Sequence, residues 1–286
     1  MFTTTSTDGV ELTVHDLGGD GPPLIYAHAT GFCGPVWGPV AEEVSGHHGV
    51  APDFRAHGRS SRPTSGNLHW DGMGDDVLAV VDALHDGAPR AGTTANLVGV
   101  GHSMGGAALL LAEIARPGLF AGLWVFEPIV FPPAIAQQIE GGNTLAEGAR
   151  RRRATFPSDE DAIANFASKP PMSSFDPRSL RAYVEGGFEP LDDGSVTLRC
   201  RPEDEAATYE MGGRHLAFDH LGEVGCPVVV VSGRDEPGPA MVAGPVADAL
   251  PRGRLVQRPD MSHFGPMEQP AEIAAMIRTF LDELSR

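Results

Sequence analysis

The sequence predicts an α/β fold in which a mostly parallel central sheet is flanked by helices. Two observations carry the prediction: short apolar segments alternate with segments of helical periodicity, and this alternation resumes at Pro227 after a long polar interruption. Such an order of strands and helices implies right-handed crossovers between parallel strands. Ligands of these sheets bind beyond the carboxyl ends of the strands, so the loops that follow the strands are where a functional site is expected.

The expected elements follow one another along the chain in this order. Strands are predicted over 10–15, 24–28, 50–54, 94–100, 123–127, 227–232 and 255–258. Helices are predicted over 75–84, 107–115, 239–250 and 270–284. With 286 residues, the chain is long enough for one large domain with an insertion.

The polar interruption is predicted to be an inserted helical cap. Between residues 129 and 221 the alternation is lost, yet aromatic and aliphatic residues recur, which argues against disorder. The core domain is therefore expected over 1–128 and 222–286. The basic run 150–153 is expected to form a solvated face of the cap, balanced by the acidic residues 159–161, because consecutive helical residues point all around the helix. The aromatic residues expected to line a substrate pocket are Phe156, Phe166, Phe175 and Tyr183.

Composition and charge disfavour several classes of partner. Lys and Arg number 21 against 38 Asp and Glu, and the net charge of −17 disfavours nucleic acid and anionic membrane surfaces. No apolar run reaches the roughly 18 residues of a membrane span, and the first residues show no basic, apolar leader. Cys33, Cys200 and Cys226 are widely spaced and form no metal or redox motif. We therefore expect a cytoplasmic protein that acts on a small molecule, while the sequence leaves its oligomeric state open.

The most informative stretch is 99–106, where Ser103 lies between a predicted strand and a predicted helix. The pattern Gly101-x-Ser103-x-Gly105 is typical of a tight elbow that holds its serine in a sparsely populated backbone conformation. The hydroxyl then projects at the start of a helix, whose free N–H groups favour developing negative charge. A dinucleotide-binding loop is excluded, because the third glycine of that motif would fall on Met104. Ser103 is the predicted nucleophile.

His263 is the predicted base. A serine nucleophile needs a base within hydrogen-bond reach, and the pKa of histidine, about 6.5, suits proton transfer near neutrality. His263 lies after the last predicted strand and before the closing helix. His102 is expected to shape the elbow, and His57 with Gly58 to fix a turn in the loop 53–60. The histidines lack the spacing of a ligand set, so no metal and no organic cofactor are expected.

Four ordered signals make the chain resemble the α/β-hydrolase family along nearly its whole length. They are residues 28–32 after an early strand, 53–60 after the next, Gly101-x-Ser103-x-Gly105, and the late His263. The order nucleophile, acid, histidine and a helical cap after the sixth strand are features of that family. The resemblance implies a catalytic triad of Ser103, His263 and an acid.

The resemblance leaves the acid open between three carboxylates. Relatives usually carry it after the strand that is here 227–232, which offers Asp235 and Glu236, and Asp235 is preferred because the shorter carboxylate is the commoner partner. Some members carry it one strand earlier, where Glu127 lies, although an ion pair with an arginine of the loop 55–62 is an equal alternative for that residue. We expect Asp235→Asn to lower acyl transfer about 10²- to 10⁴-fold, and Glu127→Gln to lower it far less.

The resemblance also implies an oxyanion hole with two backbone donors. The N–H of Met104, next after the nucleophile, is expected to be the first. The second is open, because residues 28–32 depart from the family's His-Gly-aromatic pattern by two additional residues between the histidine and the glycine. The N–H of Phe32, which follows the glycine, is preferred over that of Thr30.

A serine triad with a cap implies hydrolysis of a carboxylic ester, thioester or lactone through an acyl-enzyme. Serine at the elbow argues against relatives that open epoxides or displace halide, because those use a carboxylate nucleophile. The same triad in this family also supports cofactor-free perhydrolysis, as in haloperoxidases, and carbon–carbon bond cleavage. Some members have lost activity and serve as ligand-binding receptors. An ester hydrolase is the function that the sequence favours.

Overall fold

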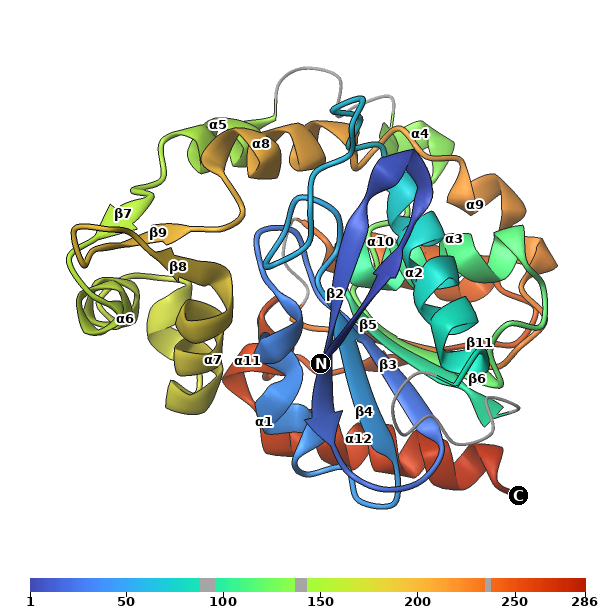
Figure 1. Cartoon of the computed structure of the whole chain (residues 1–286). Coiled ribbons are helices and arrows are strands. Elements are labelled where there is room, and N and C mark those ends of the chain that lie inside the picture. The colour runs from blue at the N-terminus through green and yellow to red at the C-terminus, as the bar shows by residue number, and fades with distance from the viewer. Residues whose placement is uncertain (88–95, 137–142, 235–237) are drawn as a thin grey trace.

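The computed structural model describes residues 1–87, 96–136, 143–234 and 238–286 (Figure 1). Within these ranges an eight-stranded sheet runs through the centre of the molecule. Its strands lie in the spatial order β1 (Phe2–Thr5), β2 (Glu11–Gly18), β4 (His48–Pro52), β3 (Pro23–Ala27), β5 (Val98–His102), β6 (Gly122–Phe126), β10 (Val228–Ser232) and β11 (Gly253–Gln257). The pairs β1–β2 and β2–β4 are antiparallel, and all other neighbours pair parallel. The prediction of an α/β fold with a mostly parallel sheet is confirmed.

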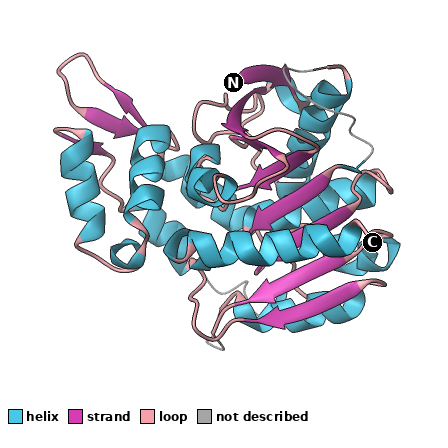
Figure 2. Ribbon diagram, turned by 90° about the horizontal axis from the view of Figure 1, so that it is seen from below, coloured by secondary structure: helices cyan, strands magenta, loops and turns pink. Residues whose placement is uncertain are grey.

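Helices cover both faces of this sheet (Figure 2). One face is packed by α2 (Trp70–His85), α3 (Met104–Ala115) and α10 (Ala240–Ala249), and the other by α1 (Gly38–Ala41) and α12 (Pro270–Leu284).

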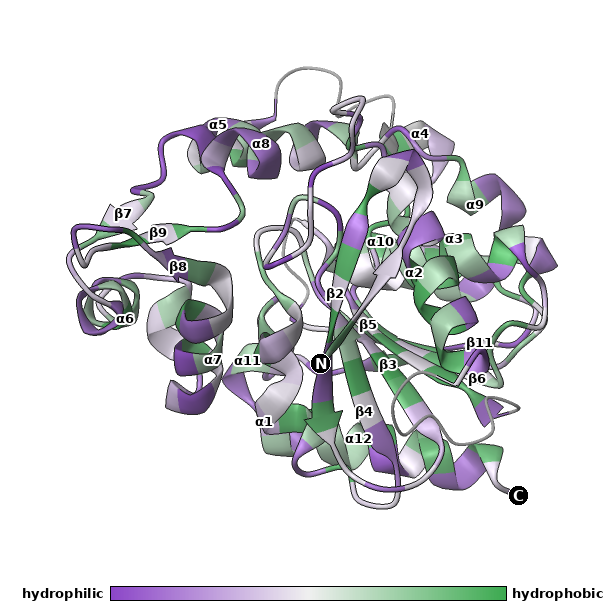
Figure 3. Cartoon of the chain, in the orientation of Figure 1, coloured by the Kyte–Doolittle hydropathy of each residue, from purple (hydrophilic) through white to green (hydrophobic). Residues whose placement is uncertain are grey.

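The strands between these layers are apolar on both sides. In β3, Ile25 and Ala27 pack with the first set of helices, whereas Leu24 and Tyr26 pack with the second. Successive side chains of a strand point to opposite faces, so a parallel sheet between two helical layers requires strands that are apolar throughout. Figure 3 shows the hydrophobic central strands and the more hydrophilic outer helices, such as α6 (Asp159–Ala167) and α7 (Pro177–Gly187).

The predicted boundaries differ from the observed ones mainly at element ends. The strand expected over 94–100 corresponds to β5, which begins at Val98 and extends to His102, and positions 94 and 95 lie outside the described residues. The helix expected over 75–84 is α2, which begins at Trp70 because the side chain of His69 caps it by accepting the N–H of Asp71. β1 has no counterpart in the prediction, since a four-residue edge strand gives only a weak alternating pattern.

Residues 129–221, which we call the insertion, leave the sheet after β6 and return before β10 (Figure 1). Besides α6 and α7, the insertion contains α4 (Pro133–Ala136), α5 (Thr144–Arg150), α8 (Pro202–Met211) and α9 (Ala217–His220). It also contains an antiparallel sheet of three short strands, β7 (Thr155–Phe156), β9 (Val196–Leu198) and β8 (Phe188–Pro190). Strands of two or three residues are too short to show a period, so the insertion is helical as expected but not only helical. Its division from the core as a separate cap domain remains a prediction.

Two further features bear on the expectations from composition. In the described part of the chain, no helix combines the length and the apolar character that crossing a membrane requires. Cys33, Cys200 and Cys226 are all buried and free.

Helix α3 comes into contact with the backbone of the sheet at Gly105. A Cβ built on Gly105 would lie 2.2 Å from the carbonyl oxygen of Ala27, at the end of β3. Only a glycine allows the first turn of the helix to lie this close to the neighbouring strand.

We expect Gly105→Ala to destabilise the fold by at least about 1–3 kcal/mol, because a methyl group there forces the helix and the strand apart. Gly148→Ala in α5 is the matched control. A Cβ at Gly148 meets nothing within 4 Å, so this substitution should stabilise the chain by about 0.5–1 kcal/mol through helix propensity. Urea unfolding of both variants measures the two changes, and a Gly105→Ala variant as stable as the parent would contradict the close approach.

Candidate active site

Ser103 connects β5 to α3 in a strained conformation. Its φ of 54° and ψ of −116° lie in a region that residues with a side chain rarely adopt. Its N–H donates to the carbonyl oxygen of Phe126 in the neighbouring strand β6 at 3.0 Å, which holds the turn against the sheet. Strain of this kind persists only where the surrounding structure enforces it, and it concentrates at functional sites. The chain therefore makes the sharp strand-to-helix turn that the glycine pattern predicts.

His263 lies in the loop between β11 and the short helix α11 (Gly265–Glu268). Its Nδ1–H donates a 2.5 Å hydrogen bond to Oε2 of Glu127, the residue that follows β6. Glu127 is 1% exposed, and its other oxygen, Oε1, accepts the N–H of Gly233 at 2.7 Å. A buried carboxylate is tolerated when its oxygens have such partners. Glu127 thus fixes the orientation of the His263 ring.

The other candidates for the acid are placed differently. Asp235 and Glu236 lie outside the described residues. The ion-pair alternative for Glu127 is wrong: Arg55 and Arg62 of the loop 55–62 pair with aspartates elsewhere, and the described ion pairs include none between that loop and Glu127.

Ser103 and His263 line the same cavity, whose volume is about 580 Å³. The described part of its wall contains no Asp, Glu, Lys or Arg side chain. Besides Ser103 and His263, residues with polar side-chain groups in the wall include Thr30, Asn143, Thr144 and Tyr209. The larger side chains of the wall are Phe32, Trp70, Ile129, Phe131, Ile135, Leu145, Tyr209, Met241, Val242 and Phe264. The cavity is therefore mainly apolar and has a few polar groups near the serine and at α5.

The aromatic residues predicted to line a pocket lie elsewhere, so that prediction is wrong. Phe156 packs on Phe166, and Phe166 packs on Tyr183, with ring centroids 5.6 Å apart in both pairs. Phe175 stacks on Phe32, on the side of that ring next to the insertion. A pattern of buried aromatics shows that a segment packs against something apolar, but it does not show whether the partner is a core or a cavity.

The loop after β3 brings two candidate oxyanion donors to the cavity wall. Thr30 and Phe32 both line it. The N–H of Phe32 donates to the carbonyl oxygen of Ala29 in a tight turn, at 3.1 Å. The hydroxyl of Thr30 contacts Sδ of Met104, the first residue of α3, at 3.3 Å. Thr30 therefore lies beside the start of the helix, and the N–H of Phe32 is already engaged.

Three further histidines are completely buried: His102 directly precedes Ser103, and the rings of His28 and His57 lie 5.3 Å apart. Nε2–H of His102 donates to the carbonyl oxygen of His263 at 2.8 Å, so His102 supports the backbone of the histidine loop. Burial lowers the pKa of His28 to about 3 and also lowers the pKa values of His57 and His102. All three rings are therefore neutral near pH 7 and act as hydrogen-bonding groups.

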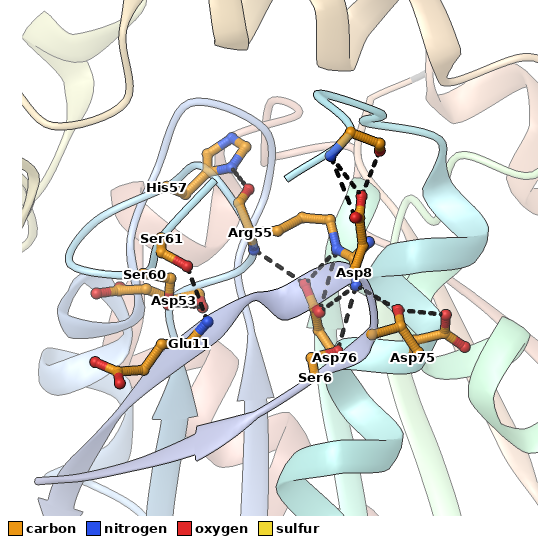
Figure 4. A network of polar contacts seen from close by, with 12 residues as sticks. Ser6, Asp8, Glu11, Asp53, Arg55, His57, Ser60, Ser61, Asp75 and Asp76 are labelled. Carbon is orange, nitrogen blue, oxygen red and sulfur yellow. Dashed lines mark hydrogen bonds and ion pairs between the residues drawn. The ribbon is translucent and has the colours of Figure 1, made fainter. Parts of the chain in front are cut away.

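Polar contacts within the loop 53–60, and from its Arg55 to Asp76 of α2, hold this loop in place (Figure 4). Nδ1–H of His57 donates to the carbonyl oxygen of Arg55 at 2.9 Å. Gly58 has a φ of +49°, and a Cβ there would lie 2.2 Å from the carboxyl group of Asp53. Both residues fix the turn as predicted, and neither lines the cavity.

The basic run 150–153 is only partly the solvated face expected for it. Arg150 and Arg151 are both exposed; Arg150 pairs with Glu203 of α8 at 3.1 Å, and Arg151 lies 3.8 Å from Glu147 of its own helix. Arg152 is 20% exposed and hydrogen-bonds Glu205 of the same helix. The acidic partners of Arg150 and Arg152 lie on α8 and not at 159–161, because α5 and α8 lie side by side (Figure 1).

Some features of the site have no signal in the sequence. The wall residues Tyr209 of α8 and Met241 of α10 reach the cavity through tertiary packing, and nothing in their local pattern distinguishes them from other helical residues. In the described ranges, no group of three or more His, Cys, Asp and Glu side chains is arranged to hold a metal ion.

Comparison with known proteins extends these observations. A model of the alpha/beta hydrolase family matches residues 24–276. The chain is 26% identical to Lipase LipV of Mycobacterium tuberculosis over 280 residues, which cover 95% of this chain and 98% of that protein. The crystal structure of E-2-(acetamidomethylene)succinate hydrolase superposes with a TM-score of 0.78 at 21% identity, over 98% of this chain and 99% of the other. A thermophilic esterase from Thermogutta terrifontis superposes with a TM-score of 0.71 at 23% identity, over 99% of this chain and 98% of the other. The two superpositions show a shared fold.

The buried histidines predict that the fold is sensitive to acid. His28 has a pKa of about 3 in the folded chain and about 6.5 when unfolded, so only the unfolded state is protonated between these values. The free energy of unfolding should therefore fall as the pH falls below about 6.5, by about 1.4 kcal/mol per pH unit for this group. Urea unfolding of the parent and of His28→Gln between about pH 7 and pH 4 should give a shallower dependence for the variant. Equal slopes would remove His28 as the cause.

Proposed function

The chain belongs to the alpha/beta hydrolase family, and from this premise we propose that it is a serine hydrolase that cleaves a carboxylic ester, thioester or lactone. One observation carries the proposal: the strained Ser103 and the Glu127-bound His263 face the same cavity. A hydroxyl, an imidazole and a buried carboxylate in this relation form the constellation that activates a serine. The similarity to a lipase supports ester bonds as the substrate.

In the proposed reaction, Oγ of Ser103 attacks the carbonyl carbon of the bound ester while Nε2 of His263 takes the hydroxyl proton. The imidazolium that forms is stabilised by the carboxylate of Glu127 through the Nδ1–H bond. Collapse of the tetrahedral intermediate breaks the carbon–oxygen bond, and the departing alcohol takes the proton from His263. Water then attacks the acyl carbon and gives a proton to Nε2 of His263. Collapse of the second tetrahedral intermediate breaks the bond to Oγ, which takes that proton from His263, and the carboxylic acid leaves.

We assign the acid to Glu127. Its carboxylate occupies the Nδ1 side of His263, and that nitrogen carries a single proton, so a second carboxylate would find no donor there. The N–H of Gly233 holds the other oxygen and fixes the orientation of the carboxylate. This assignment reverses the preference for Asp235 that the sequence suggests.

We assign the oxyanion hole to the N–H groups of Met104 and Thr30. Met104 is the first residue of a twelve-residue helix, where the N–H groups lack intrahelical partners and the helix dipole is positive. Thr30 contacts Met104 and lines the cavity. It is preferred over Phe32, because the turn to Ala29 engages the N–H of Phe32.

The cavity favours an uncharged substrate with an apolar acyl or alcohol group. An anionic substituent would lose its hydration on entering the cavity, and the described part of the wall has no Arg or Lys to compensate for that loss. Trp70, Phe131 and Met241 offer apolar surface instead. A volume of about 580 Å³ is that of a site for a small molecule.

The other functions considered from the sequence use the same scaffold. A ligand-binding receptor has no need of a serine held at a φ of 54° next to a carboxylate-bound histidine, which supports an enzyme. Perhydrolysis and carbon–carbon bond cleavage retain the triad, and no described feature favours them over ester hydrolysis.

We expect Ser103→Ala to lower kcat about 10³-fold or more with a nearly unchanged thermal midpoint, because the hydroxyl contributes the attacking atom and little packing. Hydrolysis of a 4-nitrophenyl ester by purified protein measures the loss. Ser179→Ala in α7 is the control, since Ser179 is buried, outside the cavity wall, and without a hydrogen bond for its hydroxyl in the described structure. Retained turnover in Ser103→Ala would exclude the serine mechanism.

We expect Glu127→Gln to lower kcat about 10²- to 10⁴-fold, because a glutamine no longer stabilises the imidazolium or its tautomer. Asp235→Asn should lower kcat less than about tenfold. Both variants are compared on one ester at one pH. A larger loss of kcat in Asp235→Asn than in Glu127→Gln would assign the role of the acid to Asp235.

We expect higher kcat/KM for 4-nitrophenyl octanoate than for the 4-nitrophenyl monoester of succinic acid, whose carboxylate the wall does not match. Phe131→Leu should change the ratio of kcat/KM between octanoate and acetate about tenfold. Phe166→Leu, a phenylalanine of similar partial burial that is absent from the wall, should leave the ratio unchanged. Equal effects of the two substitutions would mean that the cavity does not hold the acyl chain.

A further inference from the structure

The loop after β3 is in contact with the insertion at Gly31. Gly31 has a φ of +80°, and the space next to its Cα is filled by a carboxylate. A Cβ built on Gly31 would lie 2.6 Å from Oε1 of Glu205 in α8 and 3.4 Å from Nη1 of Arg152. The turn that carries Thr30 therefore packs against the carboxylate of Glu205 in the insertion.

Glu205 and Arg152 form a mostly buried ion pair. Nη1 of Arg152 donates to Oε2 of Glu205, and Nη2 donates to the hydroxyl of Tyr183 in α7. The side chains of Arg152 and Glu205 are 20% and 6% exposed. Burial by itself would lower the pKa of Arg152, but the charge interactions and hydrogen bonds with Tyr183 and Glu205 outweigh it and raise that pKa. Each member of the group thus holds the others in one geometry.

The same group reaches the next residue of the turn through an aromatic contact. The ring of Tyr183 packs against the ring of Phe32, with centroids 5.3 Å apart. Tyr183 is completely buried, so it has little freedom to move without Phe32. Two successive residues of the turn, Gly31 and Phe32, are therefore held by one connected set of side chains.

We propose that Arg152, Glu205 and Tyr183 are positioning residues that hold the turn 29–32, and with it the N–H of Thr30, in the geometry that stabilises the oxyanion. The inference rests on the proposed function, because it gives the turn its catalytic meaning. A purely structural role would affect stability, whereas a positioning role also affects the stabilisation of the oxyanion. The neighbouring pair Arg150 and Glu203 also joins α5 to α8, at 3.1 Å, but both side chains are exposed, and neither is among the groups nearest to the Cβ position of Gly31.

Glu205→Gln tests the proposal, because it keeps the shape of the side chain and removes the charge that orders Arg152. We expect kcat on a 4-nitrophenyl ester to fall about 10- to 100-fold, while KM stays within about twofold, since a displaced donor weakens the transition state and not the bound substrate. The affinity for a trifluoromethyl ketone, whose serine adduct places an oxyanion in the hole, should fall by the same factor. Glu203→Gln is the matched control and should change neither quantity.

Tyr183→Phe provides a second variant should Glu205→Gln fail to fold. It removes one acceptor of Arg152 and keeps the ring on Phe32, so a smaller loss of kcat and ketone affinity is expected at constant KM. Unchanged kcat in the folded variants, an equal loss in Glu203→Gln, or a loss that appears in KM would overturn the proposal. Ser103→Ala separates it from the proposed function: activity that survives Ser103→Ala rejects the serine mechanism, whereas activity lost there but unchanged in Glu205→Gln rejects the positioning role alone.

Discussion

The reversal of the chain at Ser103 is the constraint on which the arrangement of the site depends. Because Gly105 carries no side chain, α3 begins against the carbonyl oxygen of Ala27 at the end of β3. This contact sets the separation between the elbow and the loop that follows β3, and it places Thr30 beside Met104 although the two are 74 positions apart. The strained backbone at one residue is thus the condition for bringing two loops together.

The parallel sheet explains how the remaining groups meet. β3, β5 and β6 are neighbours, and the loops at their carboxyl ends carry Thr30, Ser103 and Glu127. His263 arrives at the same edge from beyond β11, and it lies 136 positions from the carboxylate that it binds. Glu127, which directly follows β6, lies at this edge, so its carboxylate reaches the histidine ring although the two residues are far apart in the sequence.

The fold, the strained turn at Ser103 and the loop position of His263 could be predicted from the sequence because their signals are local: strand and helix periods, glycines around a serine, and a histidine after the last strand. The proposed preference for Glu127 over Asp235 could not, since both residues follow predicted apolar strands and the hydrogen bond between Glu127 and His263 joins residues 136 positions apart. The prediction that Phe156 lines the pocket is wrong for a related reason. An apolar side chain indicates burial, but it does not show whether the residue packs in a core or lines a cavity. The partners of the run 150–153 depend on the contact between α5 and α8, which no local pattern encodes.

The carboxylate beside Gly31 also limits how this scaffold can be recombined. The carboxylate of Glu205 in α8 occupies the space in which a side chain at position 31 would lie. Gly31 leaves that space free because it has no side chain. A chimaera that receives a foreign insertion with a smaller side chain at position 205 would gain a hole next to the turn. One that transfers this α8 onto a loop with any side chain at position 31 would suffer a collision. An exchange of segments between homologous chains must therefore transfer positions 31 and 205 together.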